Sequence, residues 1–146
     1  MDTSPEHIKM CRMAHELQEM WKPSQGDWLF LRRIGDSPGY IKTIGGFNLN
    51  SGYYFFRDSE EIVIRDDRDC VTWLPRIDQL LPPIYTHLKE HGRVHYSNPI
   101  DNLKYIIDEY GTGDGFNRNE LSEEEYFMMV LMYEKYDKIW NGEDWI

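Results

Sequence analysis

Residues 53–56, Tyr53-Tyr54-Phe55-Phe56, are the stretch that decides the fold. Consecutive aromatic side chains are typical of a β-strand. Because side chains alternate between the two faces of a strand, this one places aromatics on both faces. We expect it to be central and covered on both sides, or to offer one face to a partner. Tyr53 and Phe55 are therefore candidate partner-binding residues.

Short runs rich in β-forming residues lie on both sides of this stretch. Clusters of turn-forming residues separate them, and short gaps favour antiparallel pairing because parallel strands need long crossovers. The runs are 28–31, 40–41, 53–56, 62–64 and 70–73. The sequence therefore predicts an antiparallel meander of four to five strands.

A helical period precedes the predicted sheet. Ser4 is placed to be the N-cap and Pro5 the first helical residue. Apolar side chains then recur at steps of three and four residues as far as Trp21, with Lys9 and Arg12 largely off the apolar face. One N-terminal helix is expected.

Three or four helices are expected after the sheet. The Pro82-Pro83 pair separates two short ones, over 76–81 and 83–91, and a third follows Asn98-Pro99. Ser122 and Glu125 form a capping box for the last helix, in which 127–132 are apolar almost all round and should be buried. We therefore predict a single α+β domain over residues 1–146.

The composition suggests a cytoplasmic protein. The chain has 146 residues, two cysteines and a net charge of −10. It has no signal-peptide pattern and no apolar run long enough to cross a membrane. Residues 28–57 have four basic side chains and one acidic (+3), whereas 101–146 have four basic and twelve acidic (−8). The overall charge opposes nucleic-acid binding.

The sequence His87-Leu88-Lys89-Glu90-His91 matches the H-x-x-E-H pattern of a class of zinc peptidases. Two histidines one helical turn apart and a nearby carboxylate could hold a metal and activate its water. Gly92 follows directly, however, so His91 falls at a helix end. We expect solvated helix-end histidines and no metal or cofactor, with a metal-dependent hydrolase using His87, Glu90 and His91 as an alternative.

Other catalytic patterns are missing from the sequence. There is no G-x-S-x-G, and Cys11 lies on the predicted core face of the first helix, where a thiol is inert. The glycine-rich residues 111–115 follow a helix instead of a strand, so they predict a helix–helix connection and not a phosphate loop. These patterns favour a non-enzymatic protein.

Three surfaces could bind a partner. Aromatics interleaved with basic residues in the predicted strands could stack single-stranded nucleic acid, although the surrounding acidity opposes this. The acidic residues of 101–146 could imitate nucleic acid on a basic host protein. Trp140 and Trp145 could anchor a partner, although such a tail usually folds back on the core. The basic residues interleaved with the aromatics of the predicted strands are Arg32, Arg33, Lys42 and Arg57.

Two islands of sequence resemble small uncharacterised proteins encoded by phages and prophages of Gram-positive bacteria. They are residues 73–80, Trp-Leu-Pro-Arg-Ile-Asp-Gln-Leu, and residues 138–145, Lys-Ile-Trp-Asn-Gly-Glu-Asp-Trp; Trp21-Lys22-Pro23 with Gly26-Asp27 fits the same resemblance. The resemblance implies an accessory protein of a mobile element that acts by binding. It implies no catalytic residues.

The function expected from these observations is protein interaction or self-association. The first alternative is an acidic inhibitor that occupies a nucleic-acid site on a host protein. The second is the metal-dependent hydrolase described above.

Overall fold

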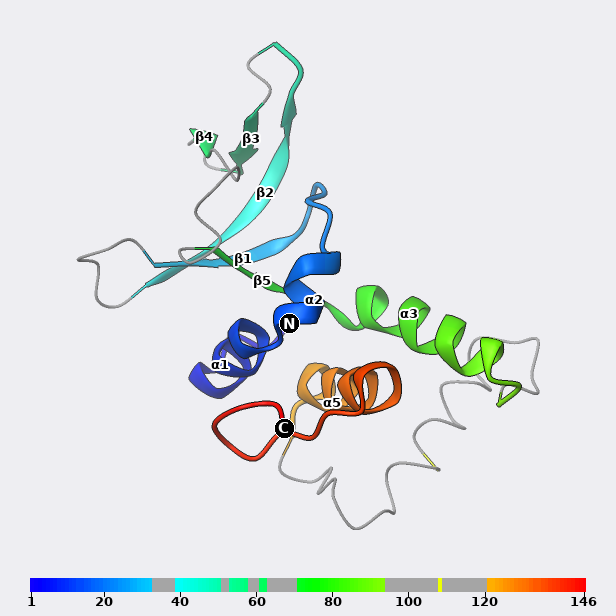
Figure 1. Ribbon diagram of the computed structural model, residues 1–146. Helices are drawn as coiled ribbons and strands as arrows, with labels where there is room; N and C mark the ends of the chain where they lie inside the picture. Colours follow the sequence, from blue (N-terminus) through cyan, green and yellow to red (C-terminus); the bar gives the residue numbers. More distant parts are fainter. Residues whose placement is uncertain (33–38, 51–52, 58–60, 63–70, 94–107, 109–120) are drawn as a thin grey trace. The chain divides into compact units, whose positions relative to one another are not determined.

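The computed structural model describes residues 1–32, 39–50, 53–57, 61–62, 71–93, 108 and 121–146. Its backbone contacts divide the chain into two compact units. The N-terminal unit is Thr3–Pro75, and the C-terminal unit is Arg76–Ile146 together with Met1–Asp2. Helices and an antiparallel sheet are both present, so the fold is α+β as predicted (Figure 1).

The N-terminal unit contains a five-stranded antiparallel sheet with the order β4-β3-β2-β1-β5. The chain runs through the first four strands as a meander and then returns, so that β5 pairs with β1. The strands are β1 Trp28–Leu31, β2 Tyr40–Asn48, β3 Tyr53–Phe56, β4 Glu61–Ile62 and β5 Val71–Leu74. The aromatic strand β3 lies between β2 and the short end strand β4.

Strand β2 is much longer than the predicted run at 40–41 because it serves two neighbours. Its first half pairs with β1 and its second half pairs with β3, with a shift in register between Ile44 and Gly46 (Figure 1). A Cβ on Gly46 would lie 2.8 Å from Cζ of Phe55. The ring of Phe55 therefore occupies the space that a side chain on β2 would need.

The predicted N-terminal helix is two helices, α1 Pro5–Met13 and α2 His15–Met20, interrupted at Ala14. Ser4 is the N-cap, with its Oγ accepting a hydrogen bond from the His7 N–H at 3.1 Å. In a continuous helix the Cys11 carbonyl would accept from the N–H four residues later. Here it accepts from the Ala14 N–H at 3.3 Å and from Nε2 of Gln18 at 3.0 Å.

The same Gln18 amide also bonds to the edge strand β5. Its Nε2 donates to the Trp73 carbonyl at 3.0 Å, and its Oε1 accepts from the Trp73 N–H at 2.8 Å. The rings of Trp21 and Trp73 stack with centroids 6.0 Å apart. The interruption at Ala14 thus places α2 where its side chains bond to the sheet, which the helical period alone does not predict.

The C-terminal unit packs helix α3, Ile77–Glu90, against helix α5, Glu123–Tyr136. The prediction of two short helices separated by Pro82-Pro83 is wrong, because α3 is continuous and contains both prolines. Leu80, Ile84 and Leu88 are fully buried and follow one another at four-residue steps. This apolar stripe continues past the prolines, and its burial outweighs the backbone bonds that they remove.

Helix α5 begins as predicted. Ser122 Oγ accepts from the Glu125 N–H at 3.1 Å, and the Glu125 carboxylate accepts from the Ser122 N–H at 2.9 Å. Residues 126–132 are all buried. Arg93 follows α3 and donates to Glu134 of α5 at 2.6 Å, which ties the end of one helix to the other.

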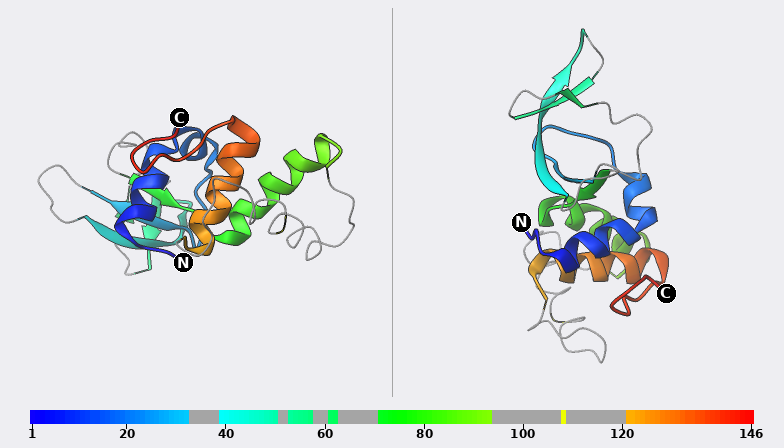
Figure 2. Two further views of the ribbon diagram at one scale, coloured as in Figure 1. Left: turned by 90° about the horizontal axis from the view of Figure 1, so that it is seen from below. Right: turned by 90° about the vertical axis from the view of Figure 1, so that its left-hand side faces the viewer.

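Figure 2 shows the same elements from two further directions. The predicted helix after Asn98-Pro99, the connection at 111–115 and Cys70 lie outside the described residues. No described helix is both long enough and apolar enough to cross a membrane.

Candidate anion-binding groove

A groove lies within the N-terminal unit, between helix α1 and strands β1 and β2. It has a volume of about 580 Å³. Sites for small ligands typically measure roughly 300–1,000 Å³. The described residues that line it are Thr3, Pro5, Ile8, Lys9, Arg12, Phe30, Arg32, Gly39, Tyr40 and Ile41.

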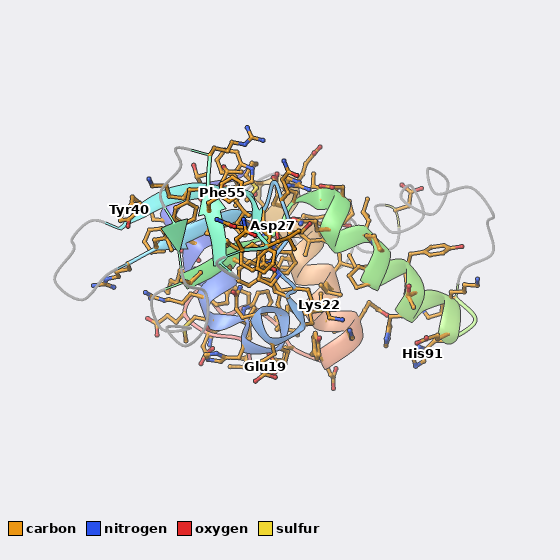
Figure 3. The ribbon with its side chains drawn as sticks, turned by 90° about the horizontal axis from the view of Figure 1, so that it is seen from above. Glu19, Lys22, Asp27, Tyr40, Phe55 and His91 are labelled. Carbon is orange, nitrogen blue, oxygen red and sulfur yellow. The ribbon has the colours of Figure 1, made fainter. Side chains whose placement is uncertain are left out.

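Local structure explains why these side chains converge. In α1, the positions 5, 8, 9 and 12 have the spacing of a single helical face. On the sheet, Phe30 of β1 is paired with Ile41 of β2, so their side chains share a face. Arg32 follows β1 directly. Tyr40 begins β2 (Figure 3).

Gly39 leaves the space that one aromatic ring of the groove occupies. A Cβ on Gly39 would lie 2.4 Å from Cζ of Phe30 and 2.6 Å from the Leu31 carbonyl oxygen. Both distances are far too short for any side chain. The Phe30 ring therefore lies directly against the Gly39 backbone.

The groove is basic although the protein is acidic. Lys9, Arg12 and Arg32 line it, and no carboxylate is among its described lining residues. The whole chain has a net charge of −10. In the part of the chain that the structure describes, neither Arg12 nor Arg32 forms a salt bridge, and both side chains are exposed. Their guanidinium groups can therefore bind an incoming anion.

An apolar surface lies beside these charges. Ile8, Phe30 and Ile41 line the groove and are each half-buried, so part of each side chain still faces solvent. Burying that surface under a ligand is favourable, and the cations fix where a negative group sits. The arrangement suits an anion attached to an apolar body.

The three residues of the alternative metal-site hypothesis lie elsewhere, at the C-terminal end of helix α3. The centroids of the His87 and His91 rings are 4.2 Å apart, and His91 lies at the end of α3 (Figure 3). Nδ1 of His91 is 2.8 Å from the His87 carbonyl oxygen, and Glu90 is exposed. These three do not form one of the ligand clusters found among the described residues.

The aromatic partner-binding candidates lie in different surroundings. Phe55 is half-buried against Gly46, as described above, and Tyr53 lies at the start of β3. Trp145 is 5% exposed and its ring is 5.2 Å from that of Trp140, centroid to centroid. The tail forms a short hairpin in which Ile139 and Ile146 exchange two backbone hydrogen bonds.

The basic residues proposed for nucleic-acid stacking are not gathered in one place. Arg32 lines the groove, whereas Lys42 and Arg57 do not. Nζ of Lys42 lies over the rings of Tyr40 and Phe56, at 5.8 and 5.4 Å from their centroids. Arg33 lies outside the described residues.

Several acidic side chains of α5 face inward. Glu124 and Glu125 are 9% and 6% exposed, and the side chain of Glu134 is 5% exposed. Part of the acidity of 101–146 therefore serves capping and ion pairing and is not displayed on a surface.

Two features of α1 escaped the sequence-based reasoning. His7 is fully buried, with its Nε2 3.4 Å from Sγ of Cys11, which is also fully buried. Lys9 and Arg12 were expected largely off the apolar face of the helix, and that expectation gave no sign that they line a groove. Their spacing from Pro5 and Ile8 indicates that the four residues share one face of the helix. That face can be recognised as part of a groove only when the strands beside α1 are known.

No protein-family model matches the chain, and neither a curated protein nor a solved structure matches it.

Proposed function

We propose that this protein acts by binding, without catalysis, and that the groove of its N-terminal unit receives an anionic group joined to an apolar body. One observation carries the proposal. Three basic side chains and no carboxylate line the described part of the groove, in a chain with ten more acidic than basic residues.

The chemistry of the described residues supports binding over catalysis. The Cys11 thiol is fully buried, which separates it from any substrate in solution. The groove itself is lined by guanidinium, ammonium, hydroxyl and apolar groups, and none of these is a usual general base near neutral pH. Such groups hold and orient a ligand.

The proposal is compatible with the other expectations from the sequence. A protein partner, self-association and an origin in a mobile genetic element stay predictions. An anionic group on a protein partner would use the same groove.

The test uses 8-anilinonaphthalene-1-sulfonate, a fluorescent sulfonate attached to aromatic rings. We expect saturable binding of one dye molecule per chain. In the double variant Arg12→Gln/Arg32→Gln, the dye should bind at least about tenfold more weakly, because hydrogen bonds to charged groups are worth roughly 1.5–3 kcal/mol each.

A matched control removes two exposed cations of the same unit that do not line the groove. The variant Lys22→Gln/Arg57→Gln should bind the dye as the wild type does. Because the dye also binds partly unfolded chains, each variant must first show the wild-type urea-unfolding midpoint. Equal binding by all three folded proteins, or none by the wild type, would rule out the groove.

A further inference from the structure

We infer that the ligand of this groove is a phosphate monoester carried on a planar ring, as in a mononucleotide. This inference rests on the proposed function and specifies its ligand. It follows from three features of the groove: which of its side chains donate hydrogen bonds, how its charges are grouped, and which rings line it.

All five polar side chains among the described lining residues of the groove can donate hydrogen bonds, and three of them can only donate. The guanidinium groups of Arg12 and Arg32 and the ammonium of Lys9 donate and cannot accept. Only the hydroxyls of Thr3 and Tyr40 can do both. A matching ligand is therefore rich in acceptors and poor in donors. A peptide is a poor match, because its backbone brings one N–H donor for nearly every carbonyl.

The grouping of the cations suits a phosphate. A phosphate monoester carries a charge of about −1.5 to −2 near neutral pH and presents three acceptor oxygens. Arginine binds such groups through two parallel hydrogen bonds, and lysine adds a point charge. Three cations lining one groove, with no carboxylate among its described lining residues, can neutralise this anion where a single surface lysine could not.

The aromatic residues suit a planar ring. Phe30 and Tyr40 both line the groove and are both half-buried, so each ring retains exposed surface. The Phe30 ring lies against the Gly39 backbone, in space that a side chain at position 39 would take from it. Stacking on aromatic side chains is a common way for proteins to bind bases. The groove volume of about 580 Å³ is that of a small-molecule site.

The test measures displacement of the sulfonate dye by three probes: adenosine 5′-monophosphate, adenosine and inorganic phosphate. We expect the nucleotide to displace the dye at concentrations at least about tenfold lower than either fragment, because only it engages both the cations and the rings. In Tyr40→Ile, the advantage of the nucleotide over phosphate should shrink while phosphate binding is kept. In Lys22→Gln/Arg57→Gln, all three probes should act as on the wild type.

The outcomes separate this inference from the proposed function. Suppose that the dye binds through Arg12 and Arg32 while the nucleotide displaces it no better than phosphate does. That result would support the anion-binding groove and contradict the inference that its ligand carries a planar ring. If a short acidic peptide of glutamates and one phenylalanine displaces the dye better than the nucleotide, the inference is also wrong. If the dye itself does not depend on Arg12 and Arg32, both proposals fall.

Discussion

At the scale of single residues, the side chain of Gln18 joins the short helix α2 to the end strand β5 by hydrogen bonds. One side-chain amide bonds to both backbone groups of Trp73 and to the carbonyl of Cys11. It therefore satisfies three backbone groups at once.

We predict that Gln18→Leu lowers the free energy of unfolding by roughly 2–4 kcal/mol, because each polar group left unpaired costs about 1–3 kcal/mol. Urea unfolding followed by tryptophan fluorescence measures the change. Exchange of the Trp73 amide hydrogen should also become faster. The neighbouring variant Glu19→Leu, at an exposed position, serves as the control and should change stability by no more than about 0.5 kcal/mol. Equal effects of the two variants would contradict this account.

The residue scale is also where the sequence predicts the structure best. Ser4 and Ser122 cap their helices as expected, because a cap depends on residues only three positions apart. The groove could not be predicted in this way. Arg12 and Arg32 are twenty positions apart in the sequence, and only the packing of α1 beside β1 and β2 makes them line one groove.

At the scale of elements, the continuous helix α3 shows how tertiary packing overrides a local signal. Pro82 and Pro83 remove two backbone N–H groups from the helix interior. The buried stripe of Leu80, Ile84 and Leu88 keeps the helix intact all the same. The strand predicted at 40–41 extends to Asn48 in the structure, because its second half pairs with β3, a contact between segments that the local pattern does not contain.

We predict that Pro82→Ala stabilises the protein by roughly 1–3 kcal/mol, because proline costs about 3 kcal/mol in a helix interior and its replacement restores a bond to the Asp78 carbonyl. Pro82 is exposed, so its ring contributes little packing. The midpoint of urea unfolding measures the gain. Thr86→Ala, at another exposed position of α3, is the control and should have a much smaller effect. A loss of stability in Pro82→Ala would show that the helix depends on the proline.

At the scale of the whole molecule, the open question is whether the two units unfold together. Trp21, Trp28 and Trp73 belong to the N-terminal unit, and Trp140 and Trp145 to the C-terminal unit. The two longest described helices, α3 and α5, are also in the C-terminal unit. Fluorescence and far-ultraviolet circular dichroism can therefore report on different units.

We predict a single cooperative transition, since a chain of 146 residues is the size of one folding domain. In the variant Trp140→Phe/Trp145→Phe, all tryptophan emission comes from the N-terminal unit, while much of the helical dichroism comes from the C-terminal unit. The two signals should change at the same urea concentration. Separate midpoints would mean that Thr3–Pro75 and the remainder are independent domains.

The bonds from Gln18 to Trp73 have one more consequence. Strand β5 is an end strand of the sheet, and such a strand would ordinarily offer its outward N–H and C=O groups to any extended chain that meets it. At Trp73 both groups are already bonded to the side-chain amide of Gln18. This amide offers the same pair of donor and acceptor as the peptide group of a neighbouring strand would. At Trp73, therefore, a second molecule finds no free backbone group to pair with, and the strand addition that leads to aggregation is hindered at this position.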